Sequence, residues 1–207
     1  MRKGEQTRRE IIRKAAPIFN QRGFAGAALS DLMKATGLEK GGIYRHFDSK
    51  EMLAAEAFDY AWRETLNARI HDLDTVSNTV DRLKQFVANF VERRGVIPGG
   101  CPLLNTAIDT DDGNSVLRER ARKALRGWQS YLISMISAGI KAREIRSRVN
   151  AQELATLIIS SLEGAIMLGR LERSEAPLLA VQAHLEDYLE AGVRSPKLRG
   201  ARNSVGR

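Results

Sequence analysis

Residues 37–50, GLEKGGIYRHFDSK, have the pattern of the turn and second helix of a helix-turn-helix, followed at once by the start of another helix. A helix that reads DNA needs small or polar residues at its N-terminal end, because only then can it enter the major groove and reach base edges. Donors further along can hold phosphates. The residues predicted to contact DNA are Lys40, Gly41, Gly42, Tyr44, Arg45, His46 and Lys50.

Two helices are predicted before this stretch. Apolar residues recur at helical spacing over residues 5–22, and Gly23 ends that segment as a C-terminal glycine does. A shorter helix follows and stops at Gly37, and the recognition helix is expected over residues 40–47. Residues 1–50 thus predict a three-helix helix-turn-helix DNA-binding domain. Phe47 is assigned to its core, and packing inside it is the alternative role for Tyr44 and His46.

The helical pattern continues after this domain. Asp48 and Glu51 have the spacing of a capping box for a long helix that should end near His71. Beyond residue 75 the apolar residues keep a helical period, with no alternation of period two. The fold class is therefore predicted as all-α. Residues 51–193 would form a helical body, and the basic residues 194–207 a disordered tail.

Charge is divided unevenly along the chain. Residues 1–50 hold 11 Lys or Arg against 5 Asp or Glu, and residues 193–207 hold 5 against 0. The middle of the chain, with 17 basic and 20 acidic residues, is slightly acidic. A basic segment fits a nucleic-acid surface, since polyanion binding releases counterions. A solvated basic face that serves only solubility is the alternative interpretation.

Composition excludes several classes of protein. The single cysteine and the three scattered histidines predict no disulfide, no metal and no other cofactor. The sequence contains no phosphate-binding glycine loop, nucleophile elbow or H-E-x-x-H pair, so an enzyme is not expected. No apolar run of membrane-spanning length and no signal peptide is apparent, so a cytoplasmic protein without membrane contact is expected.

The eighth and ninth expected helices, residues 150–171 and a segment beginning near Pro177, carry more apolar surface than one neighbour needs. Small residues on the eighth would let another backbone approach closely. They are Ser160, Ser161, Gly164, Ala165 and Gly169. These helices predict a homodimer interface, with burial inside one monomer as the alternative.

The first fifty-odd residues resemble the TetR/AcrR family of transcriptional repressors. The similarity is carried by I-x-x-A-A-x-x-F-x-x-x-G-F from Ile12, and by Gly37-Leu38, Gly41-x-x-Tyr44-x-x-Phe47 and Ser49-Lys50-Glu51-x-Leu53. This resemblance implies a homodimer that binds a palindromic double-stranded DNA operator and releases it when a small molecule binds the body. Within the motif, it implies base contacts from Lys40, Gly41 and Gly42, and phosphate contacts from Tyr44, His46 and Lys50.

Two positions depart from the family pattern. Ala27 stands where a threonine or serine often caps the second helix and touches phosphate, and Glu39 stands where a serine cap is common. These differences affect the detail of DNA contact and not the class of protein.

An apolar or electrophilic effector would be held by aromatic, methionine and a few polar side chains of the body. The residues predicted to contact it are Trp62, Phe86, Phe90, Cys101, Leu104, Asn105, Trp128, Tyr131, Met135, Glu163 and Met167. Most of these can equally be core residues. Cys101 is either an inert buried thiol or a sensor of electrophiles, since reactivity requires a lowered pKa.

A nonspecific architectural DNA-binding protein is the alternative function. It would explain the basic ends of the chain, but not a long and nearly neutral body with residues suited to a pocket. A sharp palindromic footprint would favour the regulator, and uniform coverage the architectural protein.

Overall fold

The computed structural model describes residues 3–110 and 113–196, and within these ranges the chain is helical without a named strand. The helices are α1 (Lys3–Gly26), α2 (Leu29–Thr36), α3 (Lys40–Tyr44), α4 (Lys50–Arg69), α5 (Thr79–Glu92), α6 (Pro102–Asp109), α7 (Ser115–Lys141), α8 (Ala151–Glu172) and α9 (Ala176–Tyr188). A 3-10 turn, Leu73–Thr75, and a π turn, Leu189–Val193, complete the elements. The all-α prediction is confirmed.

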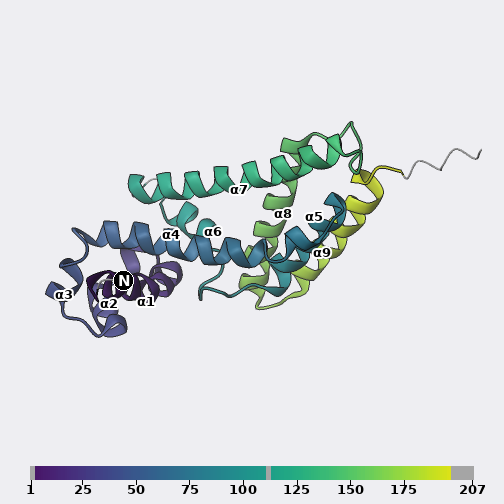
Figure 1. The fold of residues 1–207 in the computed structure, drawn as a ribbon. Coiled ribbons are helices and arrows are strands. Elements are labelled where there is room, and N and C mark those ends of the chain that lie inside the picture. The colour runs from purple at the N-terminus through teal and green to yellow at the C-terminus, as the bar shows by residue number, and fades with distance from the viewer. Residues whose placement is uncertain (1–2, 111–112, 197–207) are drawn as a thin grey trace, which may run out of the picture.

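The first three helices and the start of α4 form a head at one end of the molecule (Figure 1). Its core contains Ile11 of α1, Leu32 of α2 and Ile43 of α3, each at most 1% exposed. Phe47, immediately after α3, is also buried, as expected. The apolar faces predicted from helical spacing therefore meet in one small core.

α4 joins this head to the body and contributes to both (Figure 1). Leu53 and Ala57 pack in the head, whereas Phe58 and Trp62 pack in the body. The same helix thus carries side chains of two hydrophobic cores.

The start of α4 differs from the predicted capping box. The N-cap is Ser49, whose Oγ accepts a hydrogen bond from Met52 N at 3.1 Å, and Asp48 is exposed. Asp48 and Ser49 are both residue types that cap helices, and only one of them can occupy the N-cap position. The helix therefore begins one residue later than predicted. Glu51 instead accepts a hydrogen bond from Asn114 Nδ2, just before α7, at 2.5 Å.

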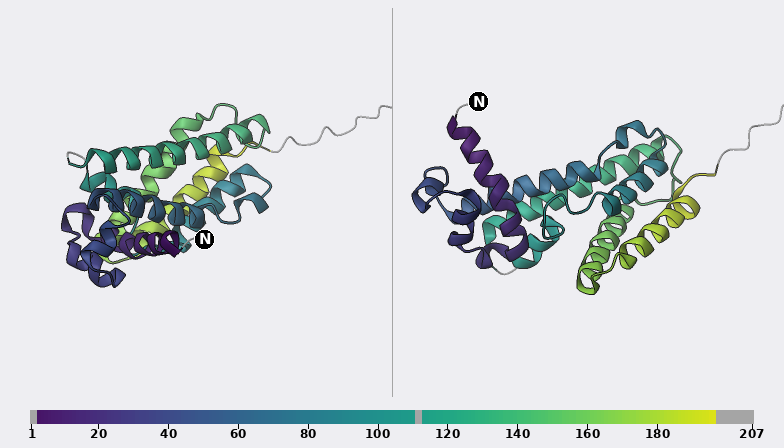
Figure 2. Two further views of the ribbon diagram at one scale, coloured as in Figure 1. Left: turned by 60° about the vertical axis from the view of Figure 1, so that its left-hand side comes forward. Right: turned by 90° about the horizontal axis from the view of Figure 1, so that it is seen from below.

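The body packs α5, α7, α8 and α9 around a cluster of aromatic rings. Trp128 of α7 is fully buried, and its ring lies 5.6 Å from Trp62, 6.2 Å from Phe86 and 6.2 Å from Phe90 between centroids. α7 runs alongside α4, and α8 and α9 form an antiparallel pair that projects from the body (Figures 1 and 2).

Several boundaries differ from those predicted. α1 continues past Gly23, where φ is 70° and the helix is kinked, and α3 ends at Tyr44 rather than Phe47. α6 ends at Asp109, whose Oδ2 accepts a hydrogen bond from Phe24 N at 2.8 Å.

Arg194 and Ser195, which the prediction assigns to a disordered tail, are hydrogen-bonded to the body. Arg194 donates to Asn78 Oδ1 at 2.9 Å and pairs with Asp81 and Glu190, while Ser195 N donates to Glu144 O at 2.8 Å. The expectation for residues 197–207 falls outside the described residues.

α8 is long and apolar enough, by length and composition alone, to cross a membrane. One such helix is weak support for a membrane protein, because the core helix of a soluble protein passes the same test. In this structure α8 packs against both α7 and α9, and part of its apolar surface is exposed. Its hydropathy is therefore accounted for by core packing and an uncovered face.

Candidate nucleic-acid interface and effector cleft

α3 presents its predicted DNA-contacting residues on the surface of the head. Lys40, Gly41 and Arg45 are exposed, whereas Tyr44 and His46 are half-buried. A Cβ at Gly41 would meet nothing within 4 Å, so the start of α3 has no bulk that would keep a duplex away. A Cβ at the half-buried Gly42 would only touch Leu38, at 3.4 Å.

Buried side chains in and immediately after α3 anchor this helix to the head core. Ile43 and Phe47 are buried, and the guanidinium of Arg8 lies 4.7 Å from the centroid of the Phe47 ring. Arg8 also pairs with Glu56 of α4. The turn before α3 requires Gly37 in the left-handed region, at φ 72°, where its amide caps α2 by donating to Met33 O.

Lys50 is less available than the sequence suggests. Its Nζ donates to Phe24 O at 2.6 Å and lies 4.7 Å from the centroid of the Phe24 ring. The lysine therefore ties the start of α4 to the end of α1, and its role in phosphate binding stays a prediction.

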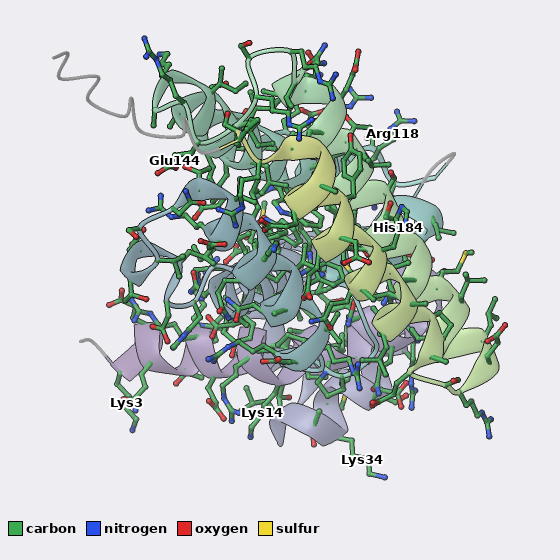
Figure 3. The ribbon with its side chains drawn as sticks, turned by 90° about the vertical axis from the view of Figure 1, so that its right-hand side faces the viewer. Lys3, Lys14, Lys34, Arg118, Glu144 and His184 are labelled. Carbon is green, nitrogen blue, oxygen red and sulfur yellow. The ribbon has the colours of Figure 1, made fainter. Side chains whose placement is uncertain are left out.

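α2 begins without a side-chain cap. The N-cap is Ala28, one residue later than the Ala27 named from the family pattern, and Ala27 is fully buried; the expected lack of a capping side chain holds. The head carries other cations, and Figure 3 shows Lys3, Lys14 and Lys34 pointing outward from it. These lysines were not among the predicted DNA contacts, because charge alone does not separate a contact residue from a solvated one.

A buried polar cluster lies at the base of the body. Arg69 of α4 is 4% exposed and donates from Nη1 to Glu163 Oε1 and from Nη2 to Cys101 Sγ, both at 3.3 Å. The Cys101 thiol donates to the same Glu163 oxygen at 3.0 Å. The guanidinium also lies 4.1 Å from the Phe90 ring centroid and 4.8 Å from that of Trp128. Ion pairing and cation–π contact together compensate the buried charge.

This environment keeps Cys101 protonated. Burial raises the pKa of its thiol to about 11, and the Glu163 carboxylate acts in the same direction. Arg69 opposes them by favouring the thiolate. A thiol with a raised pKa is a poor nucleophile at neutral pH, so the geometry favours the inert interpretation of Cys101.

A cleft of about 820 Å³ opens beside this cluster. The end of α4, residues 93–101 and the turn between α8 and α9 form its walls. Its charged lining residues are Arg69, Arg93, Arg94, Arg170, Arg173 and Glu175. The apolar part of the lining is formed by Val96, Ile97, Ile166 and Leu178.

The residues predicted to contact an effector do not converge on this cleft. Cys101 borders it, whereas Asn105 lines a cavity of about 30 Å³ against α1. Met167 is 46% exposed on the outer face of α8. The remaining predicted residues lie in or against the body core and do not border the cleft: Trp62, Phe86, Phe90, Leu104, Trp128, Tyr131, Met135 and Glu163.

The cleft arginines were missed by the sequence reasoning. They come from four places between residues 69 and 173, so no local spacing relates them. Arg93 and Arg94, immediately before a glycine-rich loop, are the one local signal that a basic site was present.

The loop that borders the cleft is hydrogen-bonded to the head. Asn20 of α1, 9% exposed, donates from Nδ2 to Pro98 O at 2.9 Å and to Gly100 O at 3.1 Å. Asn105 of α6 donates from Nδ2 to Gly99 O at 2.8 Å and to Asn20 O at 3.0 Å. The wall of the cleft and the first helix of the head thus share one network of amides.

Comparison with known proteins gives matches along almost the whole chain. The family model described as "Bacterial regulatory proteins, tetR family" matches residues 11–57, and "Tetracyclin repressor-like, C-terminal domain" matches residues 79–185. A TetR transcriptional regulator from Chloroflexus aurantiacus is 45% identical, with a TM-score of 0.90 over 95% of this chain and 100% of that one.

Two further relatives agree. A TetR-family regulator from Cytophaga hutchinsonii is 36% identical, with a TM-score of 0.88 over 95% of this chain and 99% of that one. The HTH-type transcriptional repressor DhaR of a Mycobacterium species is 26% identical over 83% of this chain and 86% of its own length. With the helix-turn-helix geometry described above, these matches show that the chain belongs to the TetR family of DNA-binding transcriptional regulators.

Proposed function

We propose that this TetR-family regulator is a dimeric repressor that binds a palindromic operator and releases it when a small molecule binds its body. The observation that carries the proposal is α3, whose start is exposed and free of bulk while Ile43 and Phe47 anchor it to the head. A rigidly held helix with an open N-terminal end suits insertion into the major groove. Residues 1–50 would form the DNA-binding domain of a cytoplasmic protein.

Dimerisation through α8 and α9 is supported by their uncovered face. On α8, Leu157, Leu168 and Leu171 are 43%, 45% and 77% exposed, and Ser161 and Gly164 lie between them at helical spacing. On α9, Leu179 is 53% and Tyr188 42% exposed, and Figure 3 shows this helix, with His184, facing the viewer. A contiguous apolar face on two adjacent helices is typical of an interface between subunits.

Effector response is supported by the connection between the cleft and the head. A ligand that moves the loop of residues 95–100 would pull on Asn20 through its hydrogen bonds, and α4 would carry displacement of the body to the C-terminal end of α3. Two heads turned in this way would no longer match adjacent major grooves, since half-sites of such dimers lie roughly 34–36 Å apart or a multiple of that.

Selection of bound sequences from random duplex DNA tests the proposal. We expect enrichment of an inverted repeat, followed by a sharp footprint over both half-sites. Uniform protection without an enriched repeat would instead support the architectural alternative, in which the basic head binds any duplex.

A further inference from the structure

We propose that the cleft beside the loop of residues 95–100 binds an anionic, partly apolar molecule through its arginines. This inference deepens the proposed function, because it names the chemical class of the effector. The recognised chemistry is an oxyanion, a carboxylate or a phosphate, attached to a short apolar group.

The first support is the imbalance of charge in the cleft. Five arginines and one glutamate line it. Arg94 pairs with Glu175, and Arg69 pairs with Glu163 behind the wall. Arg93 and Arg173 are exposed, and neither of them forms an ion pair with a carboxylate of the described residues. The cleft therefore keeps an excess of positive charge that its own acids do not neutralise.

Arg170 provides the second support. Its Nη1 donates to Gly99 O and to Asn105 Oδ1, the latter at 3.3 Å, and no carboxylate of residues 3–110 and 113–196 pairs with it. Both acceptors are neutral amide oxygens, so its charge has dipolar partners but no counterion. A carboxylate or phosphate would bind the same guanidinium more strongly, because its full negative charge adds Coulomb attraction and two of its oxygens can accept in parallel.

The remaining lining explains why the ligand should also be apolar in part. Val96, Ile97, Ile166 and Leu178 contribute to the same cleft, and Val96 is 45% exposed. Apolar lining with a few charged groups is the usual composition of a small-molecule site, in which the charges orient the ligand. An inorganic ion would leave this apolar surface in water.

Binding at Arg170 would reach the head directly. The two oxygens that Arg170 now contacts belong to the network that holds Asn20 of α1. Gly100 allows this arrangement, since a Cβ there would collide with the Arg170 guanidinium. An oxyanion that draws Arg170 away would remove one support of the loop, and this is the proposed path from ligand to DNA release.

A cation is the competing ligand. Glu163 Oε2 is buried and accepts no hydrogen bond from the described residues, and aromatic rings surround the nearby guanidinium. A quaternary ammonium ion favours such surroundings. The test must therefore compare ligands of opposite charge.

Isothermal titration calorimetry with the full chain, without DNA, makes this comparison. The probes are octanoate, octyl phosphate, octanol and octyltrimethylammonium, which share one apolar chain, each kept below its micelle concentration. We expect octanoate or octyl phosphate to bind at least tenfold more tightly than the other two, and the better of the pair identifies the oxyanion. Equal or tighter binding of octyltrimethylammonium would overturn the proposal.

Variants locate the site. Arg170→Gln should weaken binding of the better anion about tenfold or more, and Arg93→Glu, on an exposed side chain outside the core, should do the same if Arg170→Gln disturbs folding. Arg126→Gln, on an exposed arginine of α7 that does not line the cleft, is the matched control. Anion binding that is the same in all three variants would refute the cleft assignment.

Release of operator DNA is measured separately by fluorescence anisotropy. An anion that binds the cleft without releasing DNA would leave the site in place and contradict the proposed effector response. Absence of anion binding by a protein that still recognises its operator would contradict this inference alone.

Discussion

At the scale of single residues, Cys101 should be unreactive in the folded protein. Its thiol is 2% exposed and its pKa is raised to about 11, mainly by burial. We expect intact-mass analysis after iodoacetamide treatment at pH 7.5 to find the native protein unmodified. Stoichiometric labelling of a natively folded sample at that pH would contradict this and restore the sensor hypothesis.

The pH dependence of the same group follows from its raised pKa. The folded state prefers the neutral thiol, so its contribution to stability is complete below the pKa of the unfolded thiol and is lost as pH rises toward about 11. Denaturant titrations should therefore give a steeper loss of unfolding free energy between pH 8 and 11 for the native protein than for Cys101→Ala. Parallel curves would show that burial does not act on this thiol.

Lys40 and Lys50 should affect DNA binding differently. Lys40 is exposed at the start of α3, so Lys40→Ala should relax base preference at one position, by about 1–3 kcal/mol. Lys50→Ala should weaken specific and random duplexes alike and reduce the salt slope by about one.

The contact of Lys50 with Phe24 O adds a control to that experiment. Lys50→Gln can keep a hydrogen bond to this carbonyl while it loses the charge. Anisotropy that finds Lys50→Ala altering affinity at only one base position would show that the roles were assigned wrongly. Equal loss of affinity in Lys50→Ala and Lys50→Gln would show that the charge matters rather than the tie to α1.

At the scale of elements, the cap of α4 can be tested by two neighbouring substitutions. Ser49→Ala removes the acceptor of Met52 N and should cost about 1 kcal/mol of unfolding free energy. Asp48→Ala, one residue earlier and exposed, should cost much less. Urea denaturation of both variants measures the two losses of unfolding free energy. A larger loss for Asp48→Ala than for Ser49→Ala would show that Asp48 is the cap.

The α8–α9 face makes a second prediction at this scale. Leu171, 77% exposed, would be buried in a dimer, so Leu171→Arg should shift the protein to a monomer in sedimentation velocity. Ile108→Arg, on α6 and 68% exposed, is the matched control and should remain dimeric. A Leu171→Arg protein that sediments as the native dimer would place the interface elsewhere.

At the scale of the whole molecule, Asn105 should couple the body to the head. Its amide donates to Asn20 O, Asn20 Oδ1 and Gly99 O, so Asn105→Ala removes a donor from the buried Asn20 and should cost about 1–3 kcal/mol. Spin labels at Lys34→Cys should report a change of distance between the two heads when octanoate or octyl phosphate binds, and a smaller change in Asn105→Ala.

Asn67→Ala, on an exposed residue of α4, is the control for that experiment. It should keep the full change of distance. Distances that stay constant in the native protein on binding would refute the proposed movement of the heads, and distances that change equally in both variants would exclude Asn105 from the path.

Local sequence patterns were enough to predict the helices, the head and the family. Helical period, the helix-ending Gly37 and the small residues at the start of α3 are local properties, each readable within a few turns of chain. Predicted helix ends differ from the observed ones by one to four residues, as at Ser49, Tyr44 and Gly26. At Ser49 the reason is that two neighbouring residues compete for the same cap.

Only the tertiary structure decided where an effector could bind. The aromatic residues that suggested a pocket fill the body core around Trp128, and the cleft is formed by arginines far apart in sequence. Tertiary packing also brings Arg69 into hydrogen bonds with Glu163 and Cys101, and the cleft wall into hydrogen bonds with Asn20. The physical reason is that a helix depends on neighbours along the chain, whereas a cleft depends on how whole helices pack against one another.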